Sequence, residues 1–228
     1  RYTFPTGGWM RIGVIASSGG SAFDSMRRVL SGVYGAQDSY YVVTDRPCGV
    51  EALCQQAGIP HTRISEPDNT RFSERARDWF QAQGGVDTVL LYFLRLVTPE
   101  IYQTYLTFNV HPSLLPAFPG FNPIERAVQK QVRFLGATAH VVDAQTDGGA
   151  VVAQVTMPIA AGEDLARLHK YSFIQKVYLS VLVVEMCRQG TLGQTLPFTD
   201  RCNPSLSNPG LWNALLELQR SEGVEALR

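Results

Sequence analysis

The sequence has no excess of charge of either sign, because its 228 residues include 20 lysines and arginines and 20 aspartates and glutamates. Proteins that bind nucleic acid or an anionic membrane through their overall field carry a surplus of positive charge. We therefore expect neither a nucleic-acid nor a membrane partner. A small anionic ligand can still bind at a local cluster of hydrogen-bond donors.

Cysteine is scarce, and its spacing argues against two kinds of site. The four cysteines are Cys48, Cys54, Cys187 and Cys202. None of them forms a C-x-x-C pair, as in many zinc sites, and together they do not form the pattern of a disulfide framework. We expect no metal, and we expect reduced, mostly buried thiols, as in a cytosolic protein.

Long apolar segments are also missing. No run of residues is long and apolar enough to span a membrane, and residues 1–10 lack the basic and then apolar pattern of a signal peptide. Internal repeats and low-complexity tracts are absent as well. These absences favour a cytoplasmic protein, which we expect to be a monomer or a homodimer.

The sequence does have the length and apolar share, 45%, of one good-sized α/β domain. We expect three parts along the chain. Residues 1–10 form an N-terminal lead-in, residues 11–190 form the domain, and residues 191–228 form a C-terminal extension with a short helix.

Apolar runs and amphipathic segments predict the order of the elements. Strands are expected at residues 11–16, 40–44, 59–64, 86–94, 106–110, 136–142 and 151–159. Helices are expected at residues 23–30, 50–57, 71–83, 99–105, 122–131, 164–189 and 211–219, with Ser21 or Asp24 capping the first. Strands and helices alternate early and strands follow each other late, which predicts a mostly parallel sheet with antiparallel strands at one edge.

The most informative segment is Asn109–Phe118, with the sequence N-V-H-P-S-L-L-P-A-F. Asn109 and His111 are two residues apart at the end of an apolar run, so they should point to the same side of a strand. Pro112 and Pro116 end that strand and hold the next segment as a rigid loop. An amide beside an imidazole is suited to polarising a carbonyl and managing a proton.

Two loops could complete such a site. The Gly/Ser loop at residues 17–21 joins a strand to a helix, where backbone amides favour an anion, but it is too short for a dinucleotide fingerprint or a P-loop. An ordinary tight turn fits it equally well. The loop at residues 143–149 supplies two carboxylates, although a turn rich in Asp and Gly is most often only a turn. A carboxylate near the imidazole would hold its tautomer and keep it protonated.

Together these segments resemble the 10-formyltetrahydrofolate-dependent formyltransferases. The run N-V-H-P-S-L-L-P-A-F-P-G is similar to the main signature of that family, and residues 136–142 with 147–149 are similar to its second signature. Residues 93–99 resemble its folate-contacting segment. The resemblance extends over residues 11–190. It implies a Rossmann-like formyltransferase fold and an enzyme that uses 10-formyltetrahydrofolate as co-substrate, with no metal.

The resemblance also implies roles for individual residues. The catalytic trio corresponds to Asn109, His111 and Asp147. The residues expected to bind the folate are Arg71, Leu94, Arg95, Leu96, Val97, Asn109, Asp143, Ala144, Gln145, Thr146 and Asp147. The residues expected to bind the acceptor, a small-molecule amine, are Gly20, Ser21, Ala22 and Phe23.

Formyl transfer by this trio would follow ordinary carbonyl chemistry. A neutral amine attacks the formyl carbon, and a tetrahedral oxyanion develops. Asn109 and protonated His111 would donate hydrogen bonds to that oxygen. Asp147 would raise the pKa of His111 and, through water, take the proton from the attacking nitrogen.

The sequence departs from the family on the acceptor side. Ser18 and Ala22 replace a glycine and an asparagine in the Gly/Ser loop, and residues 121–124 (F-N-P-I) replace a histidine-rich stretch. In the long helix, Ile174 stands where the family has a glutamate that meets the acceptor. Ala144 and Thr146 also differ from the usual residues of the folate loop. These changes leave the identity of the formyl acceptor undetermined.

Three functions are consistent with these residues. Transfer to an amine is the first, with glycinamide ribonucleotide as the leading single acceptor and other amines, such as an amino sugar, as alternatives. Hydrolysis of 10-formyltetrahydrofolate, with water as acceptor, is the second, because Asn122-Pro123 resembles the hydrolases. A non-catalytic folate-binding protein is the third.

Overall fold

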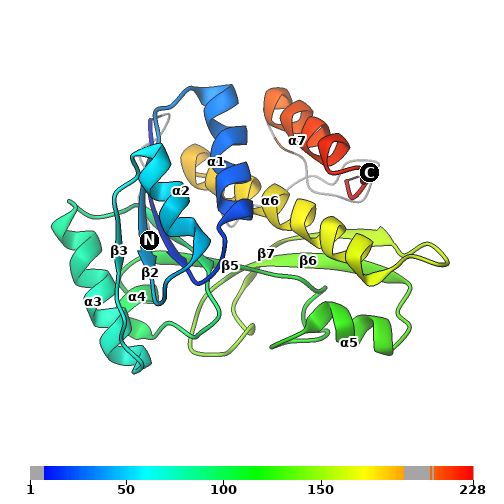
Figure 1. Ribbon diagram of the computed structural model, residues 1–228, viewed down its shortest axis with the longest axis horizontal. Coiled ribbons are helices and arrows are strands. Elements are labelled where there is room, and N and C mark those ends of the chain that lie inside the picture. The colour runs from blue at the N-terminus through cyan, green and yellow to red at the C-terminus, as the bar shows by residue number, and fades with distance from the viewer. Residues whose placement is uncertain (1–7, 193–205, 207, 228) are drawn as a thin grey trace.

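The computed structural model describes residues 8–192, 206 and 208–227 (Figure 1). Its strands are β1 (Arg11–Ala16), β2 (Ser39–Thr44), β3 (His61–Arg63), β4 (Thr88–Tyr92), β5 (Leu106–His111), β6 (Phe134–Val141) and β7 (Val151–Pro158). Its helices are α1 (Ser21–Tyr34), α2 (Gly49–Ala57), α3 (Asn69–Ala82), α4 (Pro99–Tyr102), α5 (Pro123–Gln129), α6 (Leu165–Gln189) and α7 (Pro209–Ser221).

The strands form one sheet with the order β3-β2-β1-β4-β5-β6-β7. The pairs from β3 to β5 are parallel, whereas β5 pairs with β6 and β6 with β7 in antiparallel fashion. This arrangement confirms the predicted α/β class, with a mostly parallel sheet and antiparallel strands at one edge. The parallel strands end at the same edge, so the segments that follow β1, β4 and β5 meet there.

Two apolar clusters cover the two faces of the sheet. Strands β1 and β4 are buried almost throughout because each face packs on helices, as expected for central parallel strands. The larger cluster includes apolar residues of α1, α6 and α7, which lie on the same side of the sheet (Figure 1). The smaller cluster is formed with α3 and α4 and includes Phe72, Phe80 and Ile101.

The predicted elements are all present, with small differences at their ends. Strand β1 has the predicted limits, and β5 extends one residue further than predicted, so that it includes His111. The predicted caps of the first helix are wrong. Its N-cap is Gly20 in a left-handed conformation, and no side chain caps the helix. Ser21 is the first helical residue, because the chain turns at the glycine before it.

The C-terminal extension packs on the domain where the structure describes it. Leu211, Leu215 and Leu227 are buried in the larger cluster, and the Trp212 ring lies 6.0 Å from the Tyr178 ring of α6. The predicted lead-in falls mostly on residues 1–7, which lie outside the described residues, as does much of the segment before α7.

Within the described residues, no helix is long and apolar enough to cross a membrane. The described cysteines Cys48, Cys54 and Cys187 are free thiols, and the last two are buried, in agreement with the prediction. Cys202 lies outside the described residues.

Candidate active site

Asn109 and His111 lie at the end of β5, and both approach the carboxylate of Asp147. Asn109 Nδ2 is 3.5 Å from Asp147 Oδ1, and His111 Nδ1 is 3.4 Å from Asp147 Oδ2. The predicted common orientation of the two side chains is therefore confirmed. It follows from the two-residue period of the strand. The structure brings the three predicted catalytic residues together.

Protein atoms engage both ring nitrogens of His111. Nδ1 faces Asp147, and Nε2 lies 2.9 Å from the carbonyl oxygen of Phe118. Because a carbonyl oxygen can only accept a hydrogen bond, Nε2 is the protonated nitrogen in that contact. The side chain of His111 is buried. The loop that follows β5 therefore folds back to hold the imidazole that β5 presents.

Asp147 is held in place by its backbone and by the loop that follows β5. Its φ of 53° lies in the left-handed region, which turns the side chain back toward β5. Its Oδ2 accepts a hydrogen bond of 2.8 Å from the backbone N–H of Gly120. Gly149 allows this turn, because a Cβ there would lie 1.8 Å from the carbonyl oxygen of Val141.

The carboxyl of Asp147 is an acid stabilised in its charged form. Burial acts to raise its pKa, but hydrogen bonding from His140 and from the Gly120 N–H, together with the nearby His111 and His140 rings, brings the pKa below its ordinary value. A carboxylate charged at neutral pH can accept a proton through water and can orient an imidazole.

His140 is a fourth member of the site that the sequence reasoning missed. It is the register partner of Asn109 across β5 and β6, and its Nε2 lies 3.4 Å from Asn109 Nδ2 and 3.6 Å from Asp147 Oδ1. Its Nδ1 lies 3.1 Å from the Val141 carbonyl, to which it donates. In the neutral ring Nε2 can then accept from the Asn109 amide, and in the protonated ring Nε2–H can donate to Asp147 Oδ1. The available signal was the histidine inside the second signature.

A hollow of about 280 Å³ opens beside these residues at the carboxyl ends of the parallel strands. It is lined by Asn69, Leu91, Phe93, Arg95, Leu96, Val97, Thr98, Pro99, Tyr102, Asn109, His140, Val142, Asp143, Ala144, Gln145, Thr146 and Asp147. Ligands of open α/β sheets bind in such a crevice. Most of the predicted folate-binding residues therefore surround one cavity, and His111 lies behind Asp147 rather than on the wall.

Arg71 and Leu94 are the predicted folate-binding residues that do not line the hollow. Arg71 lies in the first turn of α3 with an exposed side chain, and its backbone N–H is capped by Asp68. Leu94 lies just after β4 and is 55% exposed. Their neighbours Asn69 and Phe93 form the wall instead.

Arg95 lines the hollow, but its guanidinium is already hydrogen-bonded within the protein. It donates to Asn69 Oδ1 at 2.7 Å and to the carbonyls of Glu66 and Pro67 at 2.8 and 2.7 Å. It also lies 5.2 Å from the centre of the Phe72 ring. These contacts fasten the segment before α3 to the segment after β4, so Arg95 shapes the wall of the hollow.

The Gly/Ser loop lies at the same edge of the sheet and packs against the start of α2. A Cβ on Gly20 would lie 2.5 Å from Val50 Cγ2, and the Val50 N–H donates to the Ser18 carbonyl at 3.2 Å. Ser21 is exposed and Ala22 is partly exposed. The Phe23 side chain is fully buried beside Tyr92, so only its backbone could meet an acceptor.

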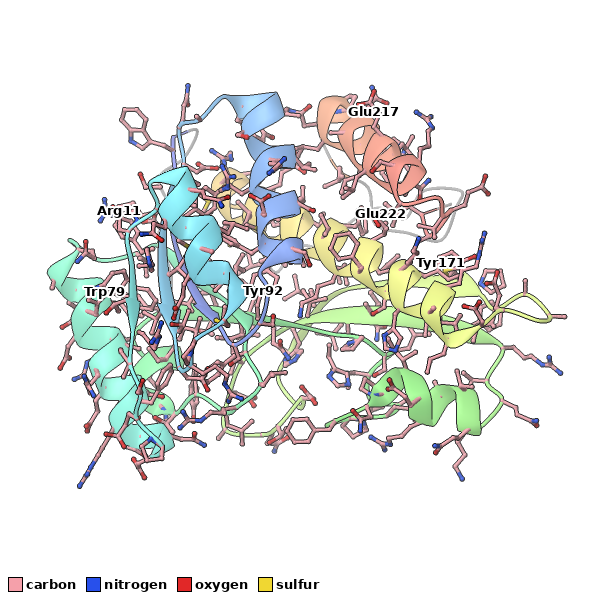
Figure 2. The ribbon with its side chains drawn as sticks, viewed as in Figure 1. Arg11, Trp79, Tyr92, Tyr171, Glu217 and Glu222 are labelled. Carbon is pink, nitrogen blue, oxygen red and sulfur yellow. The ribbon has the colours of Figure 1, made fainter. Side chains whose placement is uncertain are left out.

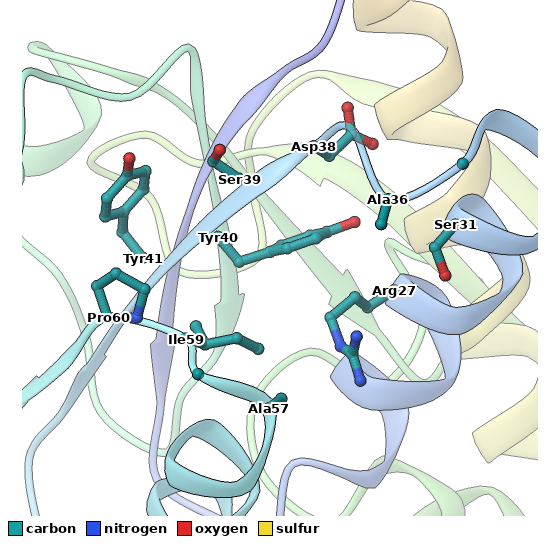
Figure 3. Close-up of a pocket in the computed structure, with 12 residues that line it drawn as sticks. Arg27, Ser31, Ala36, Asp38, Ser39, Tyr40, Tyr41, Ala57, Ile59 and Pro60 are labelled. Carbon is teal, nitrogen blue, oxygen red and sulfur yellow. The ribbon is translucent and has the colours of Figure 1, made fainter.

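A second hollow, of about 300 Å³, lies at the opposite edge of the sheet (Figure 3). Arg27 of α1 and Tyr40 of β2 point into it, and Ile59 and Pro60 form another wall. Arg27 is paired with Asp24 at 2.6 Å. This hollow shares none of its lining residues with the first, and it contains none of the predicted site residues.

Comparison with known proteins assigns the family. Residues 10–182 match the protein family described as formyl transferase. The chain belongs to this family.

Individual formyl transferases are similar over most of the chain. A phosphoribosylglycinamide formyltransferase of Mycobacterium tuberculosis is 31% identical over 191 residues, which cover 82% of this chain and 87% of the relative. The solved structure of glycinamide ribonucleotide transformylase 1 from Symbiobacterium toebii has a TM-score of 0.73 at 26% identity, covering 87% of this chain and 95% of that one.

A hydrolytic relative matches a shorter segment. A formyltetrahydrofolate deformylase of Synechocystis is 34% identical over 116 residues, which are 50% of this chain and 40% of the relative. Membership of the formyl transferase family confirms the resemblance, the fold, the enzyme class and the 10-formyltetrahydrofolate co-substrate expected from the sequence. The acceptor of the formyl group is a separate question.

Proposed function

We propose that this protein transfers the formyl group of 10-formyltetrahydrofolate to an amine, with Asn109, His111 and Asp147 as its catalytic residues. The observation that supports this most directly is the meeting of Asn109, His111 and His140 on the single charged carboxylate of Asp147, at the wall of the hollow. An amide donor, two imidazoles and a carboxylate supply every proton-transfer and hydrogen-bonding role that formyl transfer requires.

In this proposal the folate occupies the hollow, with its formyl oxygen directed to Asn109. The amine nitrogen attacks the formyl carbon, the new C–N bond forms, and the carbonyl oxygen becomes an oxyanion that accepts from Asn109 Nδ2. Asp147 takes the proton of the attacking nitrogen through water. The carbonyl then re-forms as the bond to the folate nitrogen breaks, and that nitrogen receives the proton from Asp147 through water. Each oxyanion donor contributes about 3 kcal/mol in comparable enzymes.

His111 acts in this proposal from behind Asp147. Its Nε2–H donates to Phe118 in the structure, so donation to the oxyanion requires this N–H to exchange one acceptor oxygen for the other. Its Nδ1 side orients the carboxylate. His140 fixes the Asn109 amide, because its Nε2 accepts from Nδ2.

The test is formyl transfer by variants of the trio. His111→Ala and Asp147→Ala are each expected to reduce kcat/KM by about 10²–10⁴-fold, as for the loss of general acid–base catalysis. Circular dichroism and thermal unfolding establish that each variant is folded. Retention of more than about a tenth of the activity in either folded variant would sink the assignment.

The leading acceptor is glycinamide ribonucleotide, because the relative that covers 82% of the chain is a phosphoribosylglycinamide formyltransferase. The acceptor screen follows tetrahydrofolate formation with this compound first and other amines after it. Turnover with another amine and none with glycinamide ribonucleotide would contradict this choice while leaving formyl transfer intact.

Hydrolysis is a second candidate, favoured by the deformylase match over 116 residues. Incubation with 10-formyltetrahydrofolate in the absence of any amine separates the two reactions. Release of formate at the rate of full turnover would identify a hydrolase. Turnover that depends on added amine identifies a transferase.

A further inference from the structure

Lys176 of α6 carries a charge without a counterion. Its Nζ lies 5.0 Å from the centre of the Tyr92 ring. Among the residues that the structure describes, the ammonium forms no ion pair and no hydrogen bond with a side chain or carbonyl. An aromatic ring face attracts a cation but carries no net negative charge that would neutralise it.

The side chain of Lys176 is partly exposed, although α6 is buried on either side of it. The residues before and after it, Gln175 and Val177, are fully buried, and burial lowers the pKa of the Lys176 ammonium to about 8. The chain has only three lysines among its 20 basic residues, and the other two are Lys130 and Lys170. A compact ammonium in this position is therefore unusual for this protein.

The ammonium lies at the edge of the sheet where the Gly/Ser loop begins. Tyr92 is the last residue of β4, and its carbonyl accepts from the Ser17 N–H at 3.1 Å. The Tyr92 side chain is labelled in Figure 2. Its ring is 6.3 Å from the Phe23 ring in the first turn of α1, and its hydroxyl donates to Ser180 at 3.0 Å. The Lys176 side chain thus lies where α6 faces the segment that joins β1 to α1.

This position is on the other side of the sheet from the hollow. Leu91 lines the hollow and packs with α3 and α4, whereas Tyr92, the next residue, points to α1 and α6. Lys176 is therefore separated from the proposed folate site by the end of β4. A second substrate that meets the first at the strand ends would approach along this side.

The helix offers no competing carboxylate. The only acidic residue of α6 is Glu185, nine positions after Lys176, and it accepts from Tyr34 and from the Asn208 N–H. Tyr92 and Ser180 are neutral. An anion arriving from solvent would meet an ammonium with all three N–H donors available.

We propose that Lys176 binds an anionic group of the formyl acceptor, a phosphate monoester or a carboxylate, and so selects the acceptor. This rests on the proposed function. Lys176 determines specificity without touching the reacting atoms, and Ile174, fully buried on the same helix, adds no charge that would oppose an anion.

The kinetic test compares acceptors that differ by one anionic group. Lys176→Met keeps the length of the side chain and removes its charge. Two pairs of acceptors are used: glycinamide ribonucleotide with its dephosphorylated riboside, and an amino acid with its amide. In the Lys176→Met variant, kcat/KM for the anionic member of the pair that fits the site should fall about ten-fold or more. The value of kcat/KM for the uncharged member should change less than about two-fold, and so should KM for the folate.

Lys170→Met is the matched control, because Lys170 lies on the same helix with an exposed side chain that donates to the Glu222 carbonyl at 3.2 Å. It should leave both members of each pair unchanged. An equal effect of Lys176→Met on anionic and uncharged acceptors, or no effect on either, would overturn the proposal. An effect of Lys176→Met on the ribonucleotide pair would show that Lys176 binds a phosphate, and an effect on the amino acid pair would show that it binds a carboxylate.

A binding test does not depend on turnover. Reductive ¹³C-methylation labels the lysines, and the Lys176→Met and Lys170→Met variants assign their NMR signals. Inorganic phosphate or acetate should raise the pKa of Lys176 and leave that of Lys170 unchanged. Absence of a rise with both anions would overturn the proposal. Failure to formylate any amine would instead contradict the proposed function, and this titration would still decide the role of Lys176.

Discussion

At the scale of single residues, Gly149 determines where the carboxylate of the site can lie. The backbone of residues 147–149 passes so close to the end of β6 that a methyl group on Gly149 would overlap the Val141 carbonyl oxygen. That contact is with backbone, which cannot rotate away. The position of Asp147 therefore requires a residue without a side chain at position 149.

Gly149→Ala should impair activity more than stability. We expect a cost of about 1–3 kcal/mol in the free energy of unfolding, because the loop must shift to relieve the overlap. We expect a loss of about 100-fold in kcat/KM, since a displacement of about 1 Å at a reacting group has that effect. Urea denaturation and steady-state kinetics measure the two quantities.

Gly32→Ala is the control, because a Cβ at this position of α1 has no neighbour within 4 Å. It should increase stability by about 0.5–1 kcal/mol and leave activity unchanged. Normal activity of Gly149→Ala would show that the overlap is relieved without moving Asp147.

Sequence reasoning located Asn109, His111 and Asp147 but not the residues that hold them. The orientation of Asn109 and His111 depends only on the alternation of a strand, which is a local property. The approach of His140 depends on the pairing register between β5 and β6. The contact between His111 and Phe118 depends on the path of a loop. Neither property is encoded in the spacing of residues.

At the scale of elements, the loop after β5 is fastened to the antiparallel edge of the sheet. Thr138 Oγ1 donates to the Ser113 carbonyl at 2.7 Å and accepts from the Leu115 N–H at 3.0 Å. Gln154 Nε2 donates to the Leu115 carbonyl at 2.9 Å. Strands β6 and β7 thus supply the polar partners of a loop that has little secondary structure of its own.

Thr138→Val should destabilise the protein by about 1–3 kcal/mol, because it leaves the buried Leu115 N–H without its acceptor. The midpoint of urea denaturation reports this change. Thr104→Val provides the comparison, since the Thr104 hydroxyl makes an equivalent bond to the Glu100 carbonyl in an exposed position. It should stay within about 0.5 kcal/mol of the wild type. Equal effects of the two substitutions would contradict a special role for Thr138.

The elements themselves were largely predictable, because strands and helices here have strong periodic patterns and clear glycine or proline ends. The start of α1 was not. Ser21 has the chemistry of a cap, but the packing of the Gly/Ser loop on Val50 requires a turn at Gly20, and the helix begins one residue earlier than a cap at Ser21 would place it. Tertiary contact overrode a local preference.

At the scale of the whole molecule, α6 connects the two edges of the sheet. Its first half lies near the strand ends, where Lys176 meets Tyr92, and its last turn reaches the start of β2. There the Arg188 guanidinium donates to Asp38 at 2.6 Å and to the Gly8 carbonyl at 3.0 Å. Both side chains of this ion pair are buried.

Arg188→Met should cost about 3–5 kcal/mol in the free energy of unfolding, because it leaves the Asp38 carboxylate buried without its counterion. Guanidinium chloride denaturation measures the loss. Adding Asp38→Asn to this variant removes the unpaired charge and should restore part of the stability. A cost below about 1 kcal/mol for the single variant would show that water reaches Asp38.

The sheet class was predictable from the order of elements, but the strand order was not read from the sequence. The family assignment now supports both. The sequence also did not predict how the C-terminal extension packs. Its described part buries Leu211 and Leu215 against the domain because α7 is amphipathic and α1 and α6 leave apolar side chains for it to cover.

The separation of the hollow from Lys176 by the end of β4 has an evolutionary consequence. In the proposed arrangement, substitutions on α6 and in the Gly/Ser loop can alter the acceptor, while the residues proposed to surround the folate remain constrained by the co-substrate. One-carbon chemistry and acceptor choice can therefore diverge at different rates within a single chain. An enzyme built in this way can be redirected to a new amine by changing one side of its sheet.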